Sequence, residues 1–346
     1  MAWTPKVTKS VVDGEVQSLA VGHPLVDEYL AFLGARVRLN SWLAAAYDLK
    51  VFFCVVVKEP ADVRKVDIFS FIADQRRPRH GPKVVRLEDG ESGLAARTIK
   101  RRLATLSGFF TYLVAREDVD MVANPVPSGS AGRRSAGQPG KGNRALIRTP
   151  RTLPRVVGPT DVSSFLDALR THRDRAMVNA MLLGGLRRCE VLGLRLADLN
   201  AGERRLFVAE GKAGNQRVVP ISARFFQAVG DYLLEERPLD ASTQRVFVAL
   251  KGPRRGRPLS PSGLDEVIGS ARARAGIDRL TCHQLRHTCM TRLREAGMAL
   301  EAVQAQAGHR SIESTRIYLH LGDRWVAEEY ARARAAIDHD LAQPER

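Results

Sequence analysis

The stretch GGLRRCEVLGLRLADL, residues 184–199, places two glycines before Arg187 and a carboxylate, Glu190, three positions after it. Side chains three apart share one face of a helix, so Glu190 either orients Arg187 or is an ordinary intrahelical partner. Arg187 and Arg188 could equally form a solvated pair, although a Gly-Gly-Leu run is an unusual place for one. The stretch is the first of five motifs on which the interpretation of the second half of the chain depends.

Four further motifs follow in order. They are EGKAGNQRVVPI (residues 210–221, with Lys212), HQLRHT (283–288, with His283 and Arg286), AGH (307–309, ending at His309) and STRIYLH (314–320, with Tyr318). His283 and Arg286 are three apart and therefore share a helical face. Singly, each motif has an ordinary explanation: an exposed turn for Lys212, a cap or core position for His283, core packing for Tyr318. These ordinary explanations account poorly for five motifs that occur together in this order.

The ordered set resembles the catalytic signature of the tyrosine recombinases, the family that includes phage integrases and Xer recombinases. The resemblance is dense from about residue 155 to 320, and the helical first part is more weakly similar to the family's core-binding domain. It implies a site-specific DNA recombinase or integrase that cuts and rejoins strands through a 3′-phosphotyrosine, with no ATP, metal or other cofactor. One departure is Arg188-Cys189, where many relatives carry an aliphatic residue and Ser, but it removes no catalytic group.

The chemistry of phosphoryl transfer agrees with the roles that the resemblance implies. Attack on a phosphodiester adds negative charge to its oxygens, and fixed donors that stabilise this charge are usually the largest catalytic contribution. The planar fork of Arg gives bidentate hydrogen bonds and stays charged, so we expect Arg187 and Arg286 to clamp the phosphate. His309 is expected to be a third donor. Glu190 is expected to orient Arg187 or His283.

Tyr318 is the expected nucleophile. A phenol with a pKa near ~10 is mostly protonated at neutral pH, so it needs a base or a strongly cationic pocket. His283 is our candidate for that proton transfer, and Lys212 is the candidate general acid that protonates the leaving 5′-oxygen. Tyr330 is a second tyrosine near the end of the chain, but it lacks the preceding motif and ranks well behind Tyr318.

The charge of the chain favours a polyanionic partner. Its 346 residues include 54 Lys plus Arg and 38 Asp plus Glu, so the formal net charge is 54 − 38 = +16. Nucleic acid is the simplest such partner. A GC-rich genome, in which Arg replaces Lys on solvated faces, is the alternative explanation.

Other features of composition restrict the class of protein. The four cysteines form no C-x-x-C pair, so neither a zinc ribbon nor a disulfide framework is indicated, and a reducing cytoplasm fits. The first residues, MAWTPKVTKSVVDG, contain no apolar core of a secretory signal. The longest apolar run, Val51–Val57, is too short to span a membrane.

We expect a mostly α-helical, two-domain protein with a small antiparallel β-sheet in its catalytic domain. The expected parts are a helical core-binding, SAM-like DNA-binding domain (17–124), a basic flexible linker (125–159), a catalytic domain (160–322) and a C-terminal helical tail (323–346). The linker is rich in Gly, Pro, Ser and Arg, a composition that cannot bury a core. In relatives such a tail often docks onto a neighbouring subunit, although periodicity alone also allows it to fold back on its own domain.

Hydrophobic periodicity and turn residues predict the individual elements. These are helices at 41–57 (largely buried), 67–74 and 95–115, a helix capped by Thr160 or Asp161, helical structure to about Leu199, strands at 205–209, 217–221 and 246–250, and helices from Ser260 onward.

The expected partner is double-stranded DNA, contacted mainly through its phosphates. Lys100, Arg101 and Arg102 lie beside the apolar stripe of the 95–115 helix and are the predicted DNA-binding residues, although a solvated face would explain them equally well. The resemblance implies self-association into a tetramer on two DNA sites, with accessory DNA-bending proteins as further partners. No membrane is expected.

Three other functions compete with this interpretation. In a metal-dependent hydrolase, His283, His287 and His309 would be ligands, but Gln284 stands where H-E-x-x-H has its Glu, and Arg286 would repel a cation. A DNA-binding relative that has lost catalysis would keep the fold without the full set of reactive residues. A type IB topoisomerase would keep the chemistry but relax supercoils as a monomer.

Overall fold

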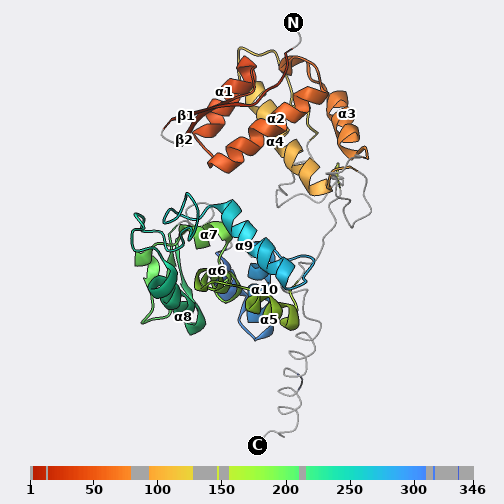
Figure 1. The fold of residues 1–346 in the computed structure, drawn as a ribbon. Helices are drawn as coiled ribbons and strands as arrows, with labels where there is room; N and C mark the ends of the chain where they lie inside the picture. The colour runs from red at the N-terminus through yellow and green to blue at the C-terminus, as the bar shows by residue number, and fades with distance from the viewer. Residues whose placement is uncertain are drawn as a thin grey trace, which may run out of the picture. The chain divides into compact units, whose positions relative to one another are not determined.

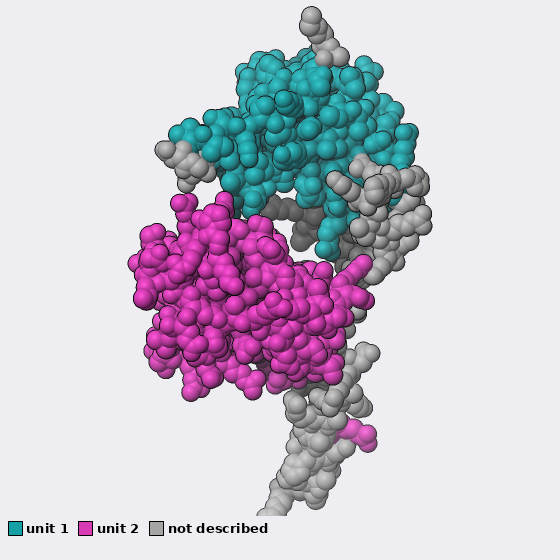
Figure 2. Space-filling model, in the orientation of Figure 1, with its two compact units in different colours: residues 1–151 teal, residues 152–346 magenta. Residues whose placement is uncertain are grey.

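The computed structural model describes residues 3–12, 15–78, 93–127, 146–147, 156–209, 216–308, 315 and 334. The chain divides into two compact units, Met1–Arg151 and Thr152–Arg346 (Figure 2). Each unit has its own hydrophobic core. The two units are therefore described one at a time.

The first unit is a set of helices with a small hairpin (Figure 1). Its elements are β1 (Thr8–Val12), β2 (Glu15–Ala20), α1 (Pro24–Gly34), α2 (Leu39–Val55), the 3-10 turn η1 (Pro60–Asp62), α3 (Lys65–Arg76) and α4 (Ala96–Val114). The helices predicted at 41–57, 67–74 and 95–115 correspond to α2, α3 and α4. Residues 17–20, which were expected to be helical, instead lie in β2. That strand forms by pairing with β1, a segment for which the sequence predicted no element.

Phenylalanines from three helices form the centre of the first core. Phe52 of α2 packs edge-to-face on Phe71 of α3 and on Phe110 of α4, with ring centroids 5.1 and 6.0 Å apart. Such edge contacts are the favoured geometry of aromatic pairs. The opposite side of α2 is open, since Tyr47 and Val55 are exposed. The prediction of a largely buried helix is therefore correct for only one side of α2.

The second unit combines helices with a three-stranded sheet. Its elements are α5 (Pro159–Asp167), α6 (His172–Leu182), α7 (Arg188–Gly193), η2 (Leu196–Asp198), β3 (Leu199–Asn200), β4 (Arg205–Val208), β5 (Arg217–Pro220), α8 (Ala223–Asp231), the π-helical turn η4 (Tyr232–Glu236), α9 (Pro261–Arg274), α10 (Cys282–Glu295) and α11 (Leu300–Ala307). The strands pair antiparallel in the order β3-β4-β5, with Leu206 opposite Val219. The expected mainly helical fold with a small antiparallel sheet is confirmed.

Two local predictions in the second unit are wrong. Neither Thr160 nor Asp161 caps α5, because the helix begins one residue earlier at Pro159, whose fixed φ suits the first helical position. Residues 246–250 form no continuous strand. They make only isolated bridges, of Val248 with Pro258 and of Ala249 with Arg255, and the turns between these residues break the ladder.

Helix α6 is the central element of the second unit. Nearly all of its side chains are buried, and it packs against α7, α8 and α10. The loop that follows α6 is consequently brought to α10, which places the GGLR and HQLR motifs side by side.

Among the described residues, no helix is both long and apolar enough to cross a membrane.

Candidate active site

The glycine pair turns the chain between α6 and α7. Gly185 has a φ of +66°, in the left-handed region that favours glycine. A Cβ atom at this position would lie 1.8 Å from Cε of Met290 on α10. The loop therefore packs directly against α10, and it delivers Arg187 to the N-terminal end of α7.

Glu190 lies among three arginines. It is 2% exposed, and its carboxylate accepts hydrogen bonds from the backbone N–H of Arg187 at 2.8 Å and from Nη1 of Arg187 at 2.7 Å. Arg217 of β5 donates Nη1 to Oε1 and Nη2 to Oε2, both at 2.9 Å. Nη1 of Arg286 on α10 lies 3.8 Å from Oε2. Three elements that are far apart in sequence thus converge on one buried carboxylate. We call Arg187, Glu190, Arg217 and Arg286 the arginine cluster.

The cluster keeps an excess of positive charge. Burial raises the pKa of Glu190, but the hydrogen bonds and charge of Arg217, followed by the backbone N–H and charge of Arg187, outweigh burial and lower this pKa to about 2. Glu190 is therefore an anion at neutral pH, and the formal charge of the cluster is +3 − 1 = +2. Guanidinium groups with such an excess suit the binding of a phosphate.

The same arginines also bind the C-terminal end of α11. The carbonyl of Gln306 accepts from Arg217 Nε at 3.1 Å, that of Ala307 from Arg286 Nη2 at 2.6 Å, and that of Gly308 from Arg187 Nη2 at 3.3 Å. The last carbonyls of a helix lack intrahelical partners and carry the negative end of the helix dipole, so cations are favoured there. The chain immediately before His309 is consequently held against the cluster.

A pair of histidines lies on the helix that carries Arg286. The Nε2 atoms of His283 and His287 are 2.7 Å apart, so one ring donates a hydrogen bond and the other accepts it. The pKa of His287 is lowered to about 4, first by burial and then by the charges of His283 and Arg286. His287 is therefore neutral at pH 7, and it can fix the orientation of the exposed His283 ring.

The described residues cover part of the predicted catalytic set. Arg187, Glu190 and Arg286 come together in the arginine cluster, and His283 lies on α10 three residues before Arg286. The remaining predicted residues, and the second tyrosine, lie outside the described residues: Lys212, His309, Tyr318 and Tyr330. In the described part of the chain, no three His, Cys, Asp or Glu side chains gather as metal ligands.

The predicted DNA-binding residues Lys100, Arg101 and Arg102 lie on α4 of the first unit. Asp48 of α2, which is 2% exposed, accepts a hydrogen bond from Arg101, and Nε of Arg102 lies 3.7 Å from the same carboxylate. Arg102 also donates to Gln75 of α3. These two arginines therefore link three helices of their own unit, whatever they do for DNA.

Two residues of the site were missed by the sequence analysis. Arg217 lies on the same face of β5 as the fully buried Val219. Since side chains alternate along a strand, an arginine at an inward-facing position was the feature of the sequence that could have identified it. Gln306 is 6% exposed, and its Nε2 donates to the carbonyls of Gly184 and Pro220, each at 3.1 Å. Nothing in the sequence around Gln306 marks it as a bridge between these segments.

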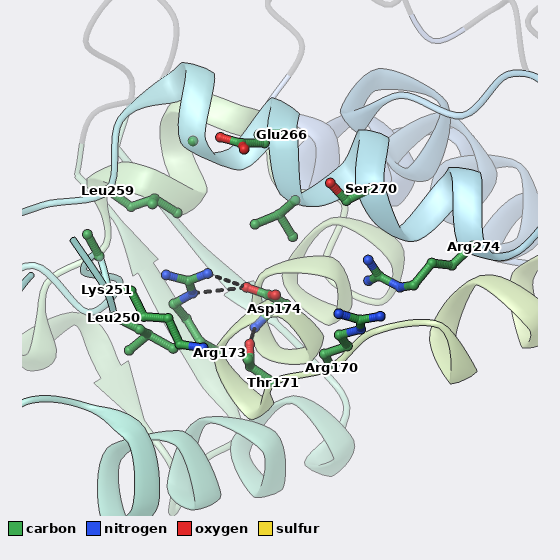
Figure 3. A pocket seen from close by; sticks show the side chains of 13 residues that line it. Arg170, Thr171, Arg173, Asp174, Leu250, Lys251, Leu259, Glu266, Ser270 and Arg274 are labelled. Carbon is green, nitrogen blue, oxygen red and sulfur yellow. Dashed lines mark hydrogen bonds and ion pairs between the residues drawn. The ribbon is translucent and has the colours of Figure 1, made fainter.

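A separate pocket of about 400 Å³ lies between the start of α6, residues 249–251 and α9 (Figure 3). Arg173 and Asp174 pair within its lining, with Nη2 and Oδ1 2.7 Å apart. Arg274 donates to the carbonyl of Ala168. None of the residues that line the pocket belongs to the arginine cluster, so this pocket is not the candidate active site.

Comparison with known sequences places the chain in a family. The model of the phage integrase family matches residues 155–324. Tyrosine recombinase XerC of Actinobacillus succinogenes is 30% identical over 260 residues, which cover 73% of this chain and 81% of that protein. Tyrosine recombinase XerC 2 of Ralstonia nicotianae is 35% identical over 210 residues, which cover 58% of this chain and 57% of that protein.

Solved structures share the fold. The Tn1549 transposon integrase in complex with a circular intermediate DNA matches with a TM-score of 0.67 and 19% identity, over 89% of this chain and 98% of that one. XerH recombinase bound to a palindromic difH substrate matches with a TM-score of 0.63 and 22% identity, over 85% and 79%. A lambda integrase dimer bound to a core site matches with a TM-score of 0.63 and 16% identity, over 87% and 96%. With the ordered motifs and the arginine cluster, the sequence matches show that the chain belongs to the phage integrase family, the site-specific tyrosine recombinases.

Proposed function

We propose that this chain cleaves and rejoins DNA at specific sites through a covalent 3′-phosphotyrosine formed at Tyr318. The arginine cluster is the observation that carries the proposal. Arg187 and Arg286, the two arginines expected to clamp a phosphate, both donate hydrogen bonds to the end of α11. Arg187 is also hydrogen-bonded to the buried Glu190, and Arg286 lies 3.8 Å from that carboxylate. Donors fixed in advance are what a transition state with growing negative charge requires.

The cleavage step exchanges one phosphate ester for another. The phenolic oxygen of Tyr318 attacks the phosphorus, its proton passes to His283, and the bond to the 5′-oxygen breaks. Lys212 gives a proton to that leaving oxygen. Arg187 and Arg286 bind the non-bridging oxygens, whose negative charge increases during the attack.

Rejoining reverses these steps. A 5′-hydroxyl attacks the phosphotyrosine, a new phosphodiester forms, and the tyrosine is released with its proton. The number of ester bonds is unchanged, so the residues of the chain suffice without ATP. His309 directly follows Gly308, whose carbonyl accepts a hydrogen bond from Arg187, and this proximity in the chain supports His309 as a third donor to the phosphate.

We further propose that the parts of the chain divide the work as in a DNA-bound assembly. Residues 17–124 would be the core-binding DNA-binding domain, 125–159 the linker, 160–322 the catalytic domain and 323–346 a tail exchanged between subunits of a tetramer on two DNA sites. Transposition, accessory DNA-bending proteins and a place in the cytoplasm or nucleoid belong to the same proposal. The net charge of +16 supports DNA as the partner, and the lambda integrase match is a dimer bound to its core site.

A suicide substrate tests the proposed chemistry. A nick beside the scissile phosphate lets the short fragment that carries the freed 5′-hydroxyl diffuse away, so the covalent protein–DNA complex accumulates. Candidate attachment sites are taken from the flanking genome. We expect a complex that forms in EDTA, is lost in Tyr318→Phe with DNA binding retained, and persists in the control Tyr330→Phe. Equal trapping by Tyr318→Phe and the unchanged protein would refute the assignment of the nucleophile.

A further inference from the structure

Arg217 lies outside the predicted catalytic set, yet it makes the most complete contact with Glu190. Its guanidinium places one nitrogen on each carboxylate oxygen, both at 2.9 Å. The side chain of Arg217 is 11% exposed and that of Glu190 is 0% exposed. Buried charges of this kind are stable only when they are paired and hydrogen-bonded.

The three arginines contribute unequally to the binding of the Glu190 carboxylate. Arg187 gives Glu190 one guanidinium nitrogen, and Arg286 is 3.8 Å away and directs its donors to the carbonyls of Gly185 and Ala307 instead. We propose that Arg217 is a positioning residue: it pairs with both oxygens of Glu190, fixes the carboxylate that orients Arg187, and offsets its negative charge so that the cluster keeps an excess of positive charge for the phosphate. This inference rests on the proposed recombinase function.

Arg217 has a second contact, with the end of α11. Its Nε donates to the carbonyl of Gln306 at 3.1 Å. Its side chain also lies against Gly308, where an added Cβ would be only 2.9 Å from Nη1 and 3.1 Å from Cδ of Arg217. Gln306 in turn donates to the carbonyl of Pro220, at the end of β5. Arg217 thus joins β5, the strand that follows the segment with Lys212, to the residues that precede His309.

The geometry requires a guanidinium rather than any cation. Three nitrogens of Arg217 are used at once, two on Glu190 and one on Gln306. The ammonium of a lysine is a point charge without the planar fork, so it cannot reproduce this set of hydrogen bonds. A lysine at position 217 would keep the charge and lose the geometry.

The test measures the single-turnover rate of covalent complex formation on a suicide substrate, at saturating protein, together with DNA affinity and the thermal unfolding midpoint. The variants are Arg217→Lys, Arg217→Gln and the double variant Arg217→Gln/Glu190→Gln. Arg205→Gln is the matched control, because Arg205 lies on the neighbouring strand β4, is exposed, and pairs only loosely with Glu203 at 3.5 Å.

We expect Arg217→Gln to slow cleavage by about 100-fold, the size of effect that follows from small misplacement of catalytic groups, while DNA affinity changes less than about threefold. Arg217→Lys should be slower by about tenfold. In the double variant the buried carboxylate that has lost Arg217 is replaced by a neutral amide, so at least about tenfold of the lost rate should return. The rate of Arg205→Gln should stay at the original value.

Several results would overturn the inference. Unchanged cleavage by Arg217→Gln would do so, as would a double variant that is as slow as Arg217→Gln, because Arg217 would then act by another route than through Glu190. If Arg217→Gln does not fold, Arg217→Lys decides, and an unchanged rate in that variant counts against the inference. An unaltered protein that forms no covalent complex overturns the proposed function itself, and the inference with it.

Discussion

A single carboxylate determines how the positive charge of the site is used. Glu190 is buried and ionised, and three arginines from α6–α7, β5 and α10 approach it. The resemblance of the ordered motifs to the family's catalytic signature was enough to predict that Arg187, Glu190 and Arg286 belong to one site. Arg217 could not be predicted in the same way, because its partnership with Glu190 depends on where β5 packs, and no local motif specifies that.

The His283–His287 pair gives a prediction about pH. The pKa of His287 is lowered from 6.5 to about 4 in the folded protein. As the pH falls, the unfolded chain therefore takes up a proton on this ring before the folded protein does. The stabilising contribution of the neutral ring is therefore complete above about pH 6.5 and is lost as the pH falls toward 4. A titration of the His287 ring followed by NMR should give a midpoint near 4, and a midpoint near 6.5 would show that the ring is neither buried nor influenced by its cationic neighbours.

The helices and strands show which kinds of structure a sequence specifies locally. Helices α2, α3 and α4 and the paired strands β4 and β5 follow from the periodicity of their own residues. The hairpin β1–β2 and the irregular segment 246–250 do not, because their conformation depends on partners elsewhere in the chain. The Gly-Gly turn is an intermediate case. The two glycines predict a turn from the sequence alone. That a side chain at Gly185 would collide with Met290 follows only from the packing of α10.

Replacing Gly185 by Ala should therefore cost more stability than backbone strain alone. Gly276 is a matched control, since its φ is +67° and nothing lies within 4 Å of an added Cβ, whereas the Cβ at position 185 would meet Met290 at 1.8 Å. We expect Gly276→Ala to lower the free energy of unfolding by about 1 kcal/mol and Gly185→Ala by a further ~1–3 kcal/mol for the forced repacking. Urea unfolding measures both, and equal losses would contradict the close packing of the loop on α10.

At the level of the complete chain, two units with separate cores share a strongly basic composition. The motif order was sufficient to predict the chemistry of the second unit, whereas the prediction that the first unit binds DNA rests on three neighbouring basic residues of α4. Two of these, Arg101 and Arg102, also pair with the buried Asp48, so their substitution would alter the fold and DNA binding together. Lys100 is the residue that separates the two effects.

Substituting Lys100 by Ala should weaken DNA binding without weakening the fold. Loss of one phosphate contact releases one fewer counterion, so the slope of log K against log salt concentration should become shallower by about 1. Arg102→Ala, which also loses its contacts with Asp48 and Gln75, should lower the unfolding midpoint as well. An unchanged salt dependence for Lys100→Ala would remove this residue from the DNA-binding surface.

The identity of the residue that carries the DNA tests most directly whether the arginine cluster prepares a phosphate for attack by a tyrosine. The covalent complex can be digested with nuclease and protease, and the peptide that retains a nucleotide can then be sequenced by mass spectrometry. We predict a single adduct, a 3′-phosphate ester on the oxygen of Tyr318. A nucleotide attached to another residue, or DNA that is cleaved without any attached peptide, would contradict the account.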